Sequence, residues 1–257
     1  MTPTRIISWN VNGIRAAERK GLRDWLASCA ADVVAFQEVK AAPAQLPATL
    51  HAPPGYHAHW LPAERPGYSG VATLSRLPPL EVRPGLGDPR FDVEGRVLLT
   101  RFASFSLYNV YVPSGTTGPE RVAYKLAFTE RLSEVLGAEL AAGTPLVVVG
   151  DLNTAHQPID LARPRENQRT SGFLPEERAA LSALLARGLV DSFRQLHPTT
   201  VKYSWWTVRA GARQRNIGWR IDYILVSSDL VPRLIAADTH PEVEGSDHCP
   251  VSVELDL

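Results

Sequence analysis

The sequence predicts an α/β (α+β) protein in which two mixed β-sheets pack face to face and helices cover their outer faces. Segments with strand patterns outnumber segments with helical patterns. Several consecutive strands are also joined by connections that suit hairpins better than βαβ crossovers, which favours mixed sheets. A chain of 257 residues fits one such domain better than two, so residues 1–257 are interpreted as a single domain.

The strand predictions rest on short apolar runs that are bounded by turn residues. The segments 69–75, 96–102 and 105–112 are the consecutive strands that look hairpin-linked. In chain order, strands are expected near residues 5–10, 32–37, 56–60, 69–75, 96–102, 105–112, 146–150, 201–207, 220–226, 232–237 and 250–256.

Helical patterns occur near residues 15–28, 120–141 and 175–187. The long middle helix carries Leu126, Leu132 and Leu136 on one stripe, and Gly143 stands where a helix would stop. The third helix begins with Pro175 and two acidic residues, which suit the positive end of a helix dipole.

Composition restricts the class of protein. Apolar residues make up 44% of the chain and charged residues 21%, as in ordinary soluble enzymes. The two cysteines, Cys29 and Cys249, are too few for a disulfide framework and are expected to be reduced, buried thiols. The chain has no apolar stretch of the length that a signal peptide or a membrane span needs, so we expect a cytoplasmic protein without membrane contact.

Charge is unevenly distributed along the chain, although the formal net charge is zero. Residues 161–220 hold ten Arg and one Lys against four acidic residues, a balance of +7 that leaves −7 for the rest. Such asymmetry is typical of a protein that docks phosphates on one face and holds acids in a cleft. Chance clustering of arginine is the alternative.

Polar residues with catalytic chemistry stand where the predicted strands begin or end. In a mixed sheet, the carboxyl ends of some strands and the amino ends of their antiparallel neighbours share one edge. We therefore expect these side chains to converge on one rim of the molecule. Asn10, Glu38, Tyr111 and Asp151 follow strands, whereas Asp222, Asp247 and His248 stand at or before strand starts.

Four of these strand-end residues offer oxygen ligands for a metal ion. Asn10 and Asn12 are two residues apart, so an extended backbone directs both side chains to the same side. Together with Glu38 and Asp247 they form an oxygen-rich set, which suits Mg²⁺, or Mn²⁺ as a substitute, rather than zinc. Taken singly, each residue is better explained as a turn or cap residue, but the four together favour a metal site.

Catalytic roles are expected for the polar residues near the remaining strand ends. Asp151 could orient or deprotonate water, and the amide of Asn153 could donate to a phosphoryl oxygen. His248 could be held by Asp222 and donate to charge that develops on a phosphate. The phenol of Tyr111 is either a second such donor or part of the core. Asp151 and Asn153 have an Asx-turn as their alternative explanation.

Aromatic and basic residues alternate between Tyr203 and Tyr223, a pattern that suits an unstacked nucleotide. Core packing of each Trp is the alternative explanation. The predicted DNA contacts from this stretch and from the preceding Pro-rich loop are Asn167, Arg169, Trp205, Arg209, Arg213 and Trp219.

Six motifs occur in an order that resembles a known family: Trp9-Asn-Val-Asn-Gly-Ile-Arg15, Phe36-Gln-Glu-Val-Lys40, Tyr111-Val-Pro113, Gly150-Asp-Leu-Asn153, Gly218-Trp-Arg-Ile-Asp-Tyr223 and Ser246-Asp-His-Cys-Pro250. From end to end the chain resembles the exodeoxyribonuclease III family of apurinic/apyrimidinic endonucleases. These proteins belong to the wider endonuclease/exonuclease/phosphatase superfamily. The segment 218–223 points to the DNA-repair branch.

The resemblance implies a four-layer α/β sandwich that cleaves DNA phosphodiesters with Mg²⁺. It implies that Glu38 is the principal metal ligand, with Asn10, Asn12 and Asp247 close by, and that Asp151 activates water with the support of Asn153. It also implies that Tyr111 and His248, the latter oriented by Asp222, stabilise the transition state. The walls of the sugar pocket would be Trp205, Trp219 and Ile221. Two features depart from some family members. Asn12 stands where some have Asp, which leaves the number of metal ions open, and the loop 114–118 has no Arg to insert into the duplex.

The expected function is therefore Mg²⁺-dependent hydrolysis of the phosphodiester 5′ of an abasic site in duplex DNA by a monomer. Exonuclease action in the 3′→5′ direction and 3′-phosphatase action on 3′-blocked ends are expected beside it. Two alternatives remain, namely a phosphomonoesterase or non-DNA phosphodiesterase of the same superfamily, and a non-catalytic binder of damaged DNA. The complete set of acids, amides and histidine argues against the binder.

Overall fold

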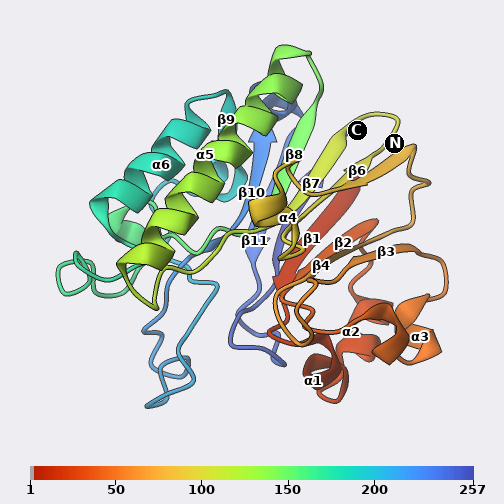
Figure 1. Ribbon diagram of the computed structural model, residues 1–257, viewed down its shortest axis with the longest axis horizontal. Helices are drawn as coiled ribbons and strands as arrows, with labels where there is room; N and C mark the ends of the chain where they lie inside the picture. Colours follow the sequence, from red (N-terminus) through yellow and green to blue (C-terminus); the bar gives the residue numbers. More distant parts are fainter. Residues whose placement is uncertain (1–2) are drawn as a thin grey trace.

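Two six-stranded β-sheets form the centre of the computed structural model, which describes residues 3–257 (Figure 1). Sheet A has the strand order β11-β12-β1-β2-β4-β3, and sheet B has the order β5-β6-β7-β8-β10-β9. The strands of sheet A are β1 (Thr4–Asn10), β2 (Val33–Gln37), β3 (His57–Leu61), β4 (Val71–Ser75), β11 (Leu234–Thr239) and β12 (Val251–Leu255). Those of sheet B are β5 (Glu81–Pro84), β6 (Val97–Arg101), β7 (Ser106–Tyr111), β8 (Leu146–Asp151), β9 (Leu189–Asp191) and β10 (Asp222–Ser227).

Both sheets are mixed, as the sequence predicted. One parallel pair lies in each sheet, β1 with β2 and β7 with β8, and the other pairs are antiparallel. The parallel pairs bring strand ends together, so that Asn10 lies opposite Gln37 and Tyr111 lies opposite Asp151. Because β10 runs antiparallel to β8, its first residue, Asp222, also lies opposite Asp151. The register of the sheets thus gathers the predicted site residues at one edge.

Helices cover the outer faces of the two sheets and complete four layers, which confirms the predicted architecture (Figure 1). The long helices α5 and α6 pack on sheet B, and α1 and α2 pack on sheet A. The α-helices are α1 (Ile14–Glu18), α2 (Leu22–Ser28), α3 (Ala48–His51), α4 (Pro89–Asp92), α5 (Pro119–Ala141), α6 (Pro175–Leu185) and α7 (Ser192–Leu196), and the 3₁₀ helices are η1 (Pro43–Gln45), η2 (Pro158–Asp160) and η3 (Ser228–Arg233).

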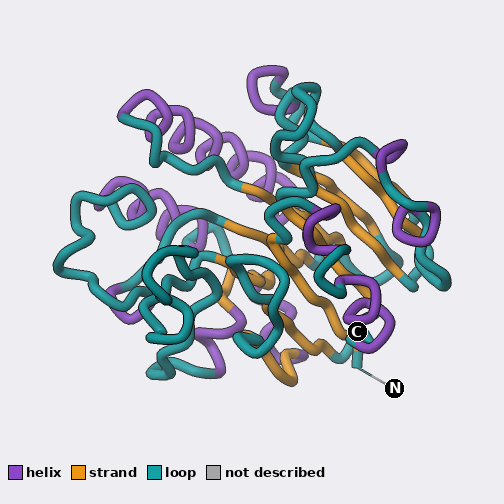
Figure 2. Tube along the Cα trace, turned by 90° about the horizontal axis from the view of Figure 1, so that it is seen from below, coloured by secondary structure: helices purple, strands orange, loops and turns teal. Residues whose placement is uncertain are grey.

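The space between the sheets is filled mainly by branched apolar side chains, for example Ile6 and Val33 of sheet A against Val147 and Ile224 of sheet B. Seen from below in Figure 2, loops rather than helices cover much of the lower end of the strands. The strand ends that carry Asp151 and Asp222 lie side by side at one edge of sheet B. Among residues 3–257, no helix is both long and apolar enough to cross a membrane.

Two sequence predictions about elements were wrong. Residues 201–207 form no strand, because only Trp205 pairs there, in isolated bridges to Trp219 and His248. The predicted helix 15–28 is divided into α1 and α2 by Gly21, whose φ of 97° lies in the left-handed region and ends a helix. The short elements β5, β9, α3, α4 and α7 were not predicted, because three to five residues show too little periodicity.

Candidate active site

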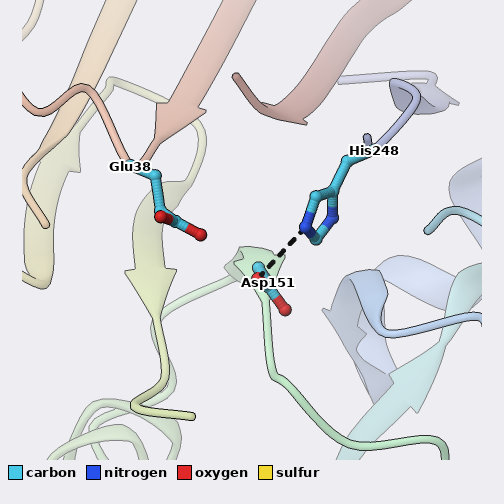
Figure 3. Close-up of side chains that lie close together, drawn as sticks. All are labelled: Glu38, Asp151 and His248. Carbon is cyan, nitrogen blue, oxygen red and sulfur yellow. Dashed lines mark ion pairs between the residues drawn. The ribbon is translucent and has the colours of Figure 1, made fainter. Parts of the chain in front are cut away.

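Three side chains from distant parts of the chain meet at the shared edge of the sheets. Glu38 directly follows β2, Asp151 ends β8, and His248 stands shortly before β12. One oxygen or nitrogen atom of each lies within 4.8 Å of the others, and Figure 3 shows the three side chains directed toward one another. The closest approach of His248 to Asp151, from Nε2 to Oδ2, is 3.9 Å.

The backbone at this site adopts conformations that side chains normally avoid. Asn12, Glu38, Lys40 and Asn153 have φ values of 44°, 51°, 49° and 49°, in the left-handed region. Asparagine tolerates this region, whereas glutamate and lysine are strained there. Because strained residues of this kind concentrate at functional sites, the backbone indicates a functional role independently of the side-chain chemistry.

Gly150 brings Asp151 into place. Its φ is 141°, and a Cβ atom added there would overlap the carbonyl group of Val110 on the neighbouring strand. Only glycine therefore lets β8 lie this close to β7 directly before the carboxylate of Asp151.

Asp151 is held by amide groups in a buried environment. Its Oδ2 accepts hydrogen bonds from Asn10 Nδ2 at 2.9 Å and Asn153 Nδ2 at 3.2 Å, and its Oδ1 accepts one from the backbone nitrogen of Asn153 at 2.8 Å. Burial, together with the negative charge of Asp222, raises the pKa of Asp151 to about 7. This carboxyl group can therefore gain or release a proton near neutral pH.

His248 and Asp222 form the pair that the sequence suggested, with 2.9 Å between His248 Nδ1 and Asp222 Oδ2. Burial of the ring lowers the pKa of His248, but the carboxylates of Asp222 and Asp151 outweigh burial and raise it to about 10. The ring is therefore an imidazolium at neutral pH. It donates through Nδ1 to Asp222 and presents a second N–H, on Nε2, toward Asp151.

Glu38 is an ionised carboxylate that faces a cation. Burial raises the pKa of Glu38, but the ammonium group of Lys40 and the amide of Asn10 outweigh burial and hold it below its ordinary value. Lys40 Nζ lies 2.7 Å from Glu38 Oε2 and 2.5 Å from Asn12 Oδ1. Two oxygens of the predicted metal-ligand set thus face a positive charge, that of the Lys40 ammonium group.

Asp247 belongs to the same group of carboxylates. Its Oδ1 accepts from Asn12 Nδ2 at 2.9 Å and its Oδ2 from Trp205 Nε1 at 3.1 Å. Burial raises the pKa of Asp247, but the charge of His248 and these donors outweigh it, so the pKa lies below the ordinary value. Carboxylate oxygens of this kind are the ligands that Mg²⁺ prefers, so the residues present fit such an ion.

The position of Asn10 differs from the predicted ligand role. Its Oδ1 accepts the backbone N–H of Asn12 at 3.0 Å, which turns its Nδ2 toward Glu38 and Asp151. Asn10 therefore acts as a hydrogen-bond donor between two carboxylates, rather than as an oxygen ligand. The backbone N–H of Asn12 fixes this orientation of the amide.

A pocket of about 290 Å³ opens beside these groups. The predicted wall residues Trp205, Trp219 and Ile221 line it together with Glu38, Asp151 and His248. The rings of Trp205 and Trp219 meet edge to face, with 6.4 Å between their centres. Tyr111 also lines the pocket, where burial and then the charges of Glu38 and Asp151 raise the pKa of its phenol well above its usual range, so that the phenol stays protonated.

The other predicted DNA contacts lie outside this pocket. Arg169 and Arg209 are exposed, and the side chain of Asn167 donates to the carbonyl oxygen of Arg163. Arg213 differs from the prediction, because its guanidinium donates to the carbonyl oxygens of Ser246, Pro241 and Val243 at 2.9, 2.9 and 2.6 Å. It supports the turn before His248 instead of facing outward.

Part of the arginine excess in residues 161–220 is also directed inward. Arg220 is only 2% exposed and pairs with Asp160 at 2.9 Å and Asp191 at 2.7 Å. Arg194 shares Asp160 at 2.6 Å. The positive surface of this segment is therefore smaller than its composition suggests.

Sequence reasoning missed several residues that shape the site. Lys40 stands two residues after Glu38, and this spacing was the available signal for a shared side of the chain. The pocket wall formed by Thr170, Ser171 and Gly172 gave no signal, because it lies in an irregular loop.

Lys125 was missed because a lysine within a helix is normally exposed. It is instead buried, with its Nζ 2.8 Å from Glu177 and 2.6 Å from the carbonyl oxygen of Asn153. The Lys125–Glu177 ion pair thereby links the turn after β8 to α5 and α6.

Comparison with known proteins agrees with this geometry. A family described as the endonuclease/exonuclease/phosphatase family matches residues 7–248. An exodeoxyribonuclease of Bacillus subtilis is 42% identical over 255 residues, which cover 98% of this chain and all of the relative.

Two solved structures share the fold. An AP endonuclease from Archaeoglobus fulgidus has a TM-score of 0.90 at 30% identity, covering 99% of this chain and 100% of the other. A Neisseria 3′ phosphatase, NExo, bound to a product DNA hairpin also has a TM-score of 0.90, at 31% identity and with the same coverage. With its acidic cluster at the edge of two mixed sheets, the chain belongs to the endonuclease/exonuclease/phosphatase family.

Proposed function

We propose that this protein is a DNA-repair nuclease that hydrolyses the phosphodiester bond 5′ of an abasic site and leaves a 3′-hydroxyl. One observation carries the proposal: Glu38, Asp151 and His248 share one pocket with Trp205 and Trp219. A pocket of about 290 Å³ with indole walls suits a sugar without its base, placed next to groups that handle a phosphate.

Mg²⁺ is the ion that this site fits best. Glu38 and Asp247 would hold it, with Asn12 beside them, because they present oxygen atoms in the open part of the site. When bound, the ion supplies positive charge that offsets the charge of the phosphate in the transition state. Mn²⁺ has the same ligand preference and is the expected substitute.

Side chains of the protein would activate the water and stabilise the transition state. Asp151, with a pKa of about 7, accepts the proton of the attacking water or orients that water, and Asn153 and Asn10 hold its carboxylate in place. The imidazolium of His248 donates from Nε2 to an oxygen of the phosphate, while Asp222 fixes the ring. The protonated phenol of Tyr111, which also lines the pocket, is a second donor.

The names of the relatives support further activities on the same substrate class. They include an exodeoxyribonuclease, an AP endonuclease and a 3′ phosphatase bound to product DNA. We therefore propose 3′→5′ exonuclease and 3′-phosphatase action on duplex DNA beside abasic-site cleavage. All groups in the site come from one chain, so a monomer suffices for the reaction.

An end-labelled duplex with one abasic analogue tests the proposal, beside an intact duplex and a small phosphate monoester. We expect one cut on the 5′ side of the analogue in the presence of Mg²⁺ and none in EDTA. Hydrolysis of the monoester without cleavage of the abasic duplex would favour a phosphomonoesterase instead. Tight abasic-site binding without cleavage, with both Mg²⁺ and Mn²⁺, would favour a non-catalytic binder.

A further inference from the structure

Tyr111 packs against a buried arginine, Arg96, which does not line the pocket. Arg96 stands just before β6 and is 2% exposed. Its guanidinium carbon lies 4.5 Å from the centre of the Tyr111 ring. Its Nη1 donates to the carbonyl oxygen of Tyr111 at 3.1 Å, and the backbone nitrogen of Tyr111 donates back to the carbonyl oxygen of Arg96 at 2.8 Å. One residue thus holds both the ring face and the backbone of the phenol.

The Nη2 and Nε atoms of the Arg96 guanidinium also have partners. Its Nη2 donates to the hydroxyl of Tyr68 at 2.9 Å, and its Nε pairs with Glu94. Arg121 pairs with the same carboxylate at 3.0 Å and donates to the same hydroxyl at 2.8 Å. Two guanidinium groups therefore share one carboxylate, and a positive charge remains behind Tyr111.

This arrangement affects the phenol in two ways. A cation over the face of an aromatic ring is attracted to its electrons, and it draws electron density away from the hydroxyl oxygen. The phenol then becomes a stronger hydrogen-bond donor. The stacking and the two backbone contacts also fix the direction in which the ring points into the pocket, which reduces the reorganisation needed during the reaction.

We propose that Arg96 is a positioning residue that acts through Tyr111, by aiming its phenol and strengthening the hydrogen bond that the phenol donates to the phosphate in the transition state. The inference rests on the proposed role of Tyr111 as a phosphate donor. Arg96 itself touches neither substrate nor metal, because its guanidinium is enclosed by Tyr111, Tyr68 and Glu94.

A double-mutant cycle tests this coupling with the wild type, Arg96→Met, Tyr111→Phe and the double variant. We expect Arg96→Met to lower kcat about tenfold, which corresponds to ~1.4 kcal/mol, while KM changes less than about twofold. In the Tyr111→Phe background the same substitution should change kcat by less than about twofold, because the hydroxyl it acts on is gone. Equal losses in both backgrounds, or no loss in either, would overturn the proposal.

Two further variants separate positioning from mere support of the fold. Arg121→Met removes a partner of the same Glu94 and Tyr68, but its guanidinium stacks on Tyr124, at 4.3 Å, so kcat should stay within about twofold. A tenfold loss there would contradict a specific role of Arg96. Arg96→Lys retains the charge and should recover part of kcat. If Arg96→Met does not fold, Arg96→Lys replaces it in the double-mutant cycle. The expected loss of kcat is then smaller, and it should again disappear in the Tyr111→Phe background.

The test of Arg96 and the test of the proposed function rest on different measurements. Cleavage of the abasic duplex by the wild type tests the function, and only the ratios among variants test Arg96. The cycle is run on whichever the wild type hydrolyses among the abasic duplex, a 3′-phosphorylated primer and bis-p-nitrophenyl phosphate. A wild type that hydrolyses none of them would overturn both proposals.

Discussion

Asp151 is buried at the end of β8, where it is 1% exposed and its carboxylate accepts a hydrogen bond from Asn10 of the other sheet. The apolar run before it predicted a buried strand end. The sequence did not reveal that Asn10, from another sheet, donates to the same carboxylate, because contacts between sheets leave no local pattern. The chemistry of a strand-end residue can thus be predicted, whereas its partners depend on how the sheets pack.

We predict that Asp151→Asn lowers kcat on an abasic duplex by about 10²–10⁴, because the amide can no longer accept a proton. Affinity for the same duplex in EDTA should change little, since the shape of the pocket is retained. Steady-state kinetics and fluorescence anisotropy measure the two quantities. Asp229→Asn, at an exposed aspartate in η3, is the matched control and should leave both unchanged. A parallel loss of binding and turnover would contradict the role given to Asp151.

At the scale of elements, the extended segment 219–221 just before β10 directs alternate side chains to two different environments. Trp219 and Ile221 line the pocket, whereas Arg220 between them points the other way, into a buried pair of carboxylates. The sequence interpretation treated this aromatic and basic stretch as a nucleotide-binding surface. The structure leaves only the alternate residues, Trp219 and Ile221, at the pocket, because neighbouring residues of an extended chain face opposite sides.

The buried cluster of Arg220 with Asp160 and Asp191 makes the stability of the folded state depend on pH. Burial raises the pKa of Asp160, but Arg220 and Arg194 outweigh burial and hold it below its ordinary value of about 4. A carboxyl group whose pKa is depressed by folding stabilises the protein above its unfolded pKa, and this contribution is lost as the pH falls through the folded value. We predict that Asp160→Asn lowers the free energy of unfolding by about 3 kcal/mol at pH 7.

Urea denaturation from pH 7 to pH 2.5 measures this contribution. The difference between wild type and Asp160→Asn should shrink below about pH 4, where the carboxyl group of the unfolded wild type takes up a proton while that of the folded protein is still charged, and it is lost as the pH falls through the folded pKa. Glu166→Gln, at an exposed glutamate, should show no such dependence. A difference that stays constant down to pH 2.5 would show that Asp160 contributes through shape and not through charge.

For the whole molecule, the two-sheet class was predictable because alternating and continuous apolar runs identify strands. The segment 201–207 was not, because its aromatic residues resemble a strand. In the structure they divide between the pocket, which takes Trp205, and a small separate cluster around Tyr203 and Trp206. A local pattern shows which residues are buried but does not show which of several apolar sites buries them.

The first and last strands of the described chain, β1 and β12, pair with each other in sheet A. β1 pairs with β2 on one side and with β12, near the end of the chain, on the other. The core between the sheets also draws on both halves of the chain. We therefore predict a single cooperative unfolding transition for residues 1–257, with equal calorimetric and van't Hoff enthalpies in differential scanning calorimetry. Two resolved transitions would show that the sheets unfold as separate domains.

Titration with Mn²⁺ in the absence of DNA tests most directly whether Glu38 and Asp247 form a cation site. Isothermal calorimetry on the wild type, Glu38→Gln, Asp247→Asn and the exposed control Glu166→Gln compares the candidate ligands without requiring turnover. We predict binding by the wild type and the control, and a loss of about tenfold or more in affinity for Glu38→Gln and for Asp247→Asn. Wild-type affinity in Glu38→Gln, or no binding by the wild type, would contradict a metal site at this edge.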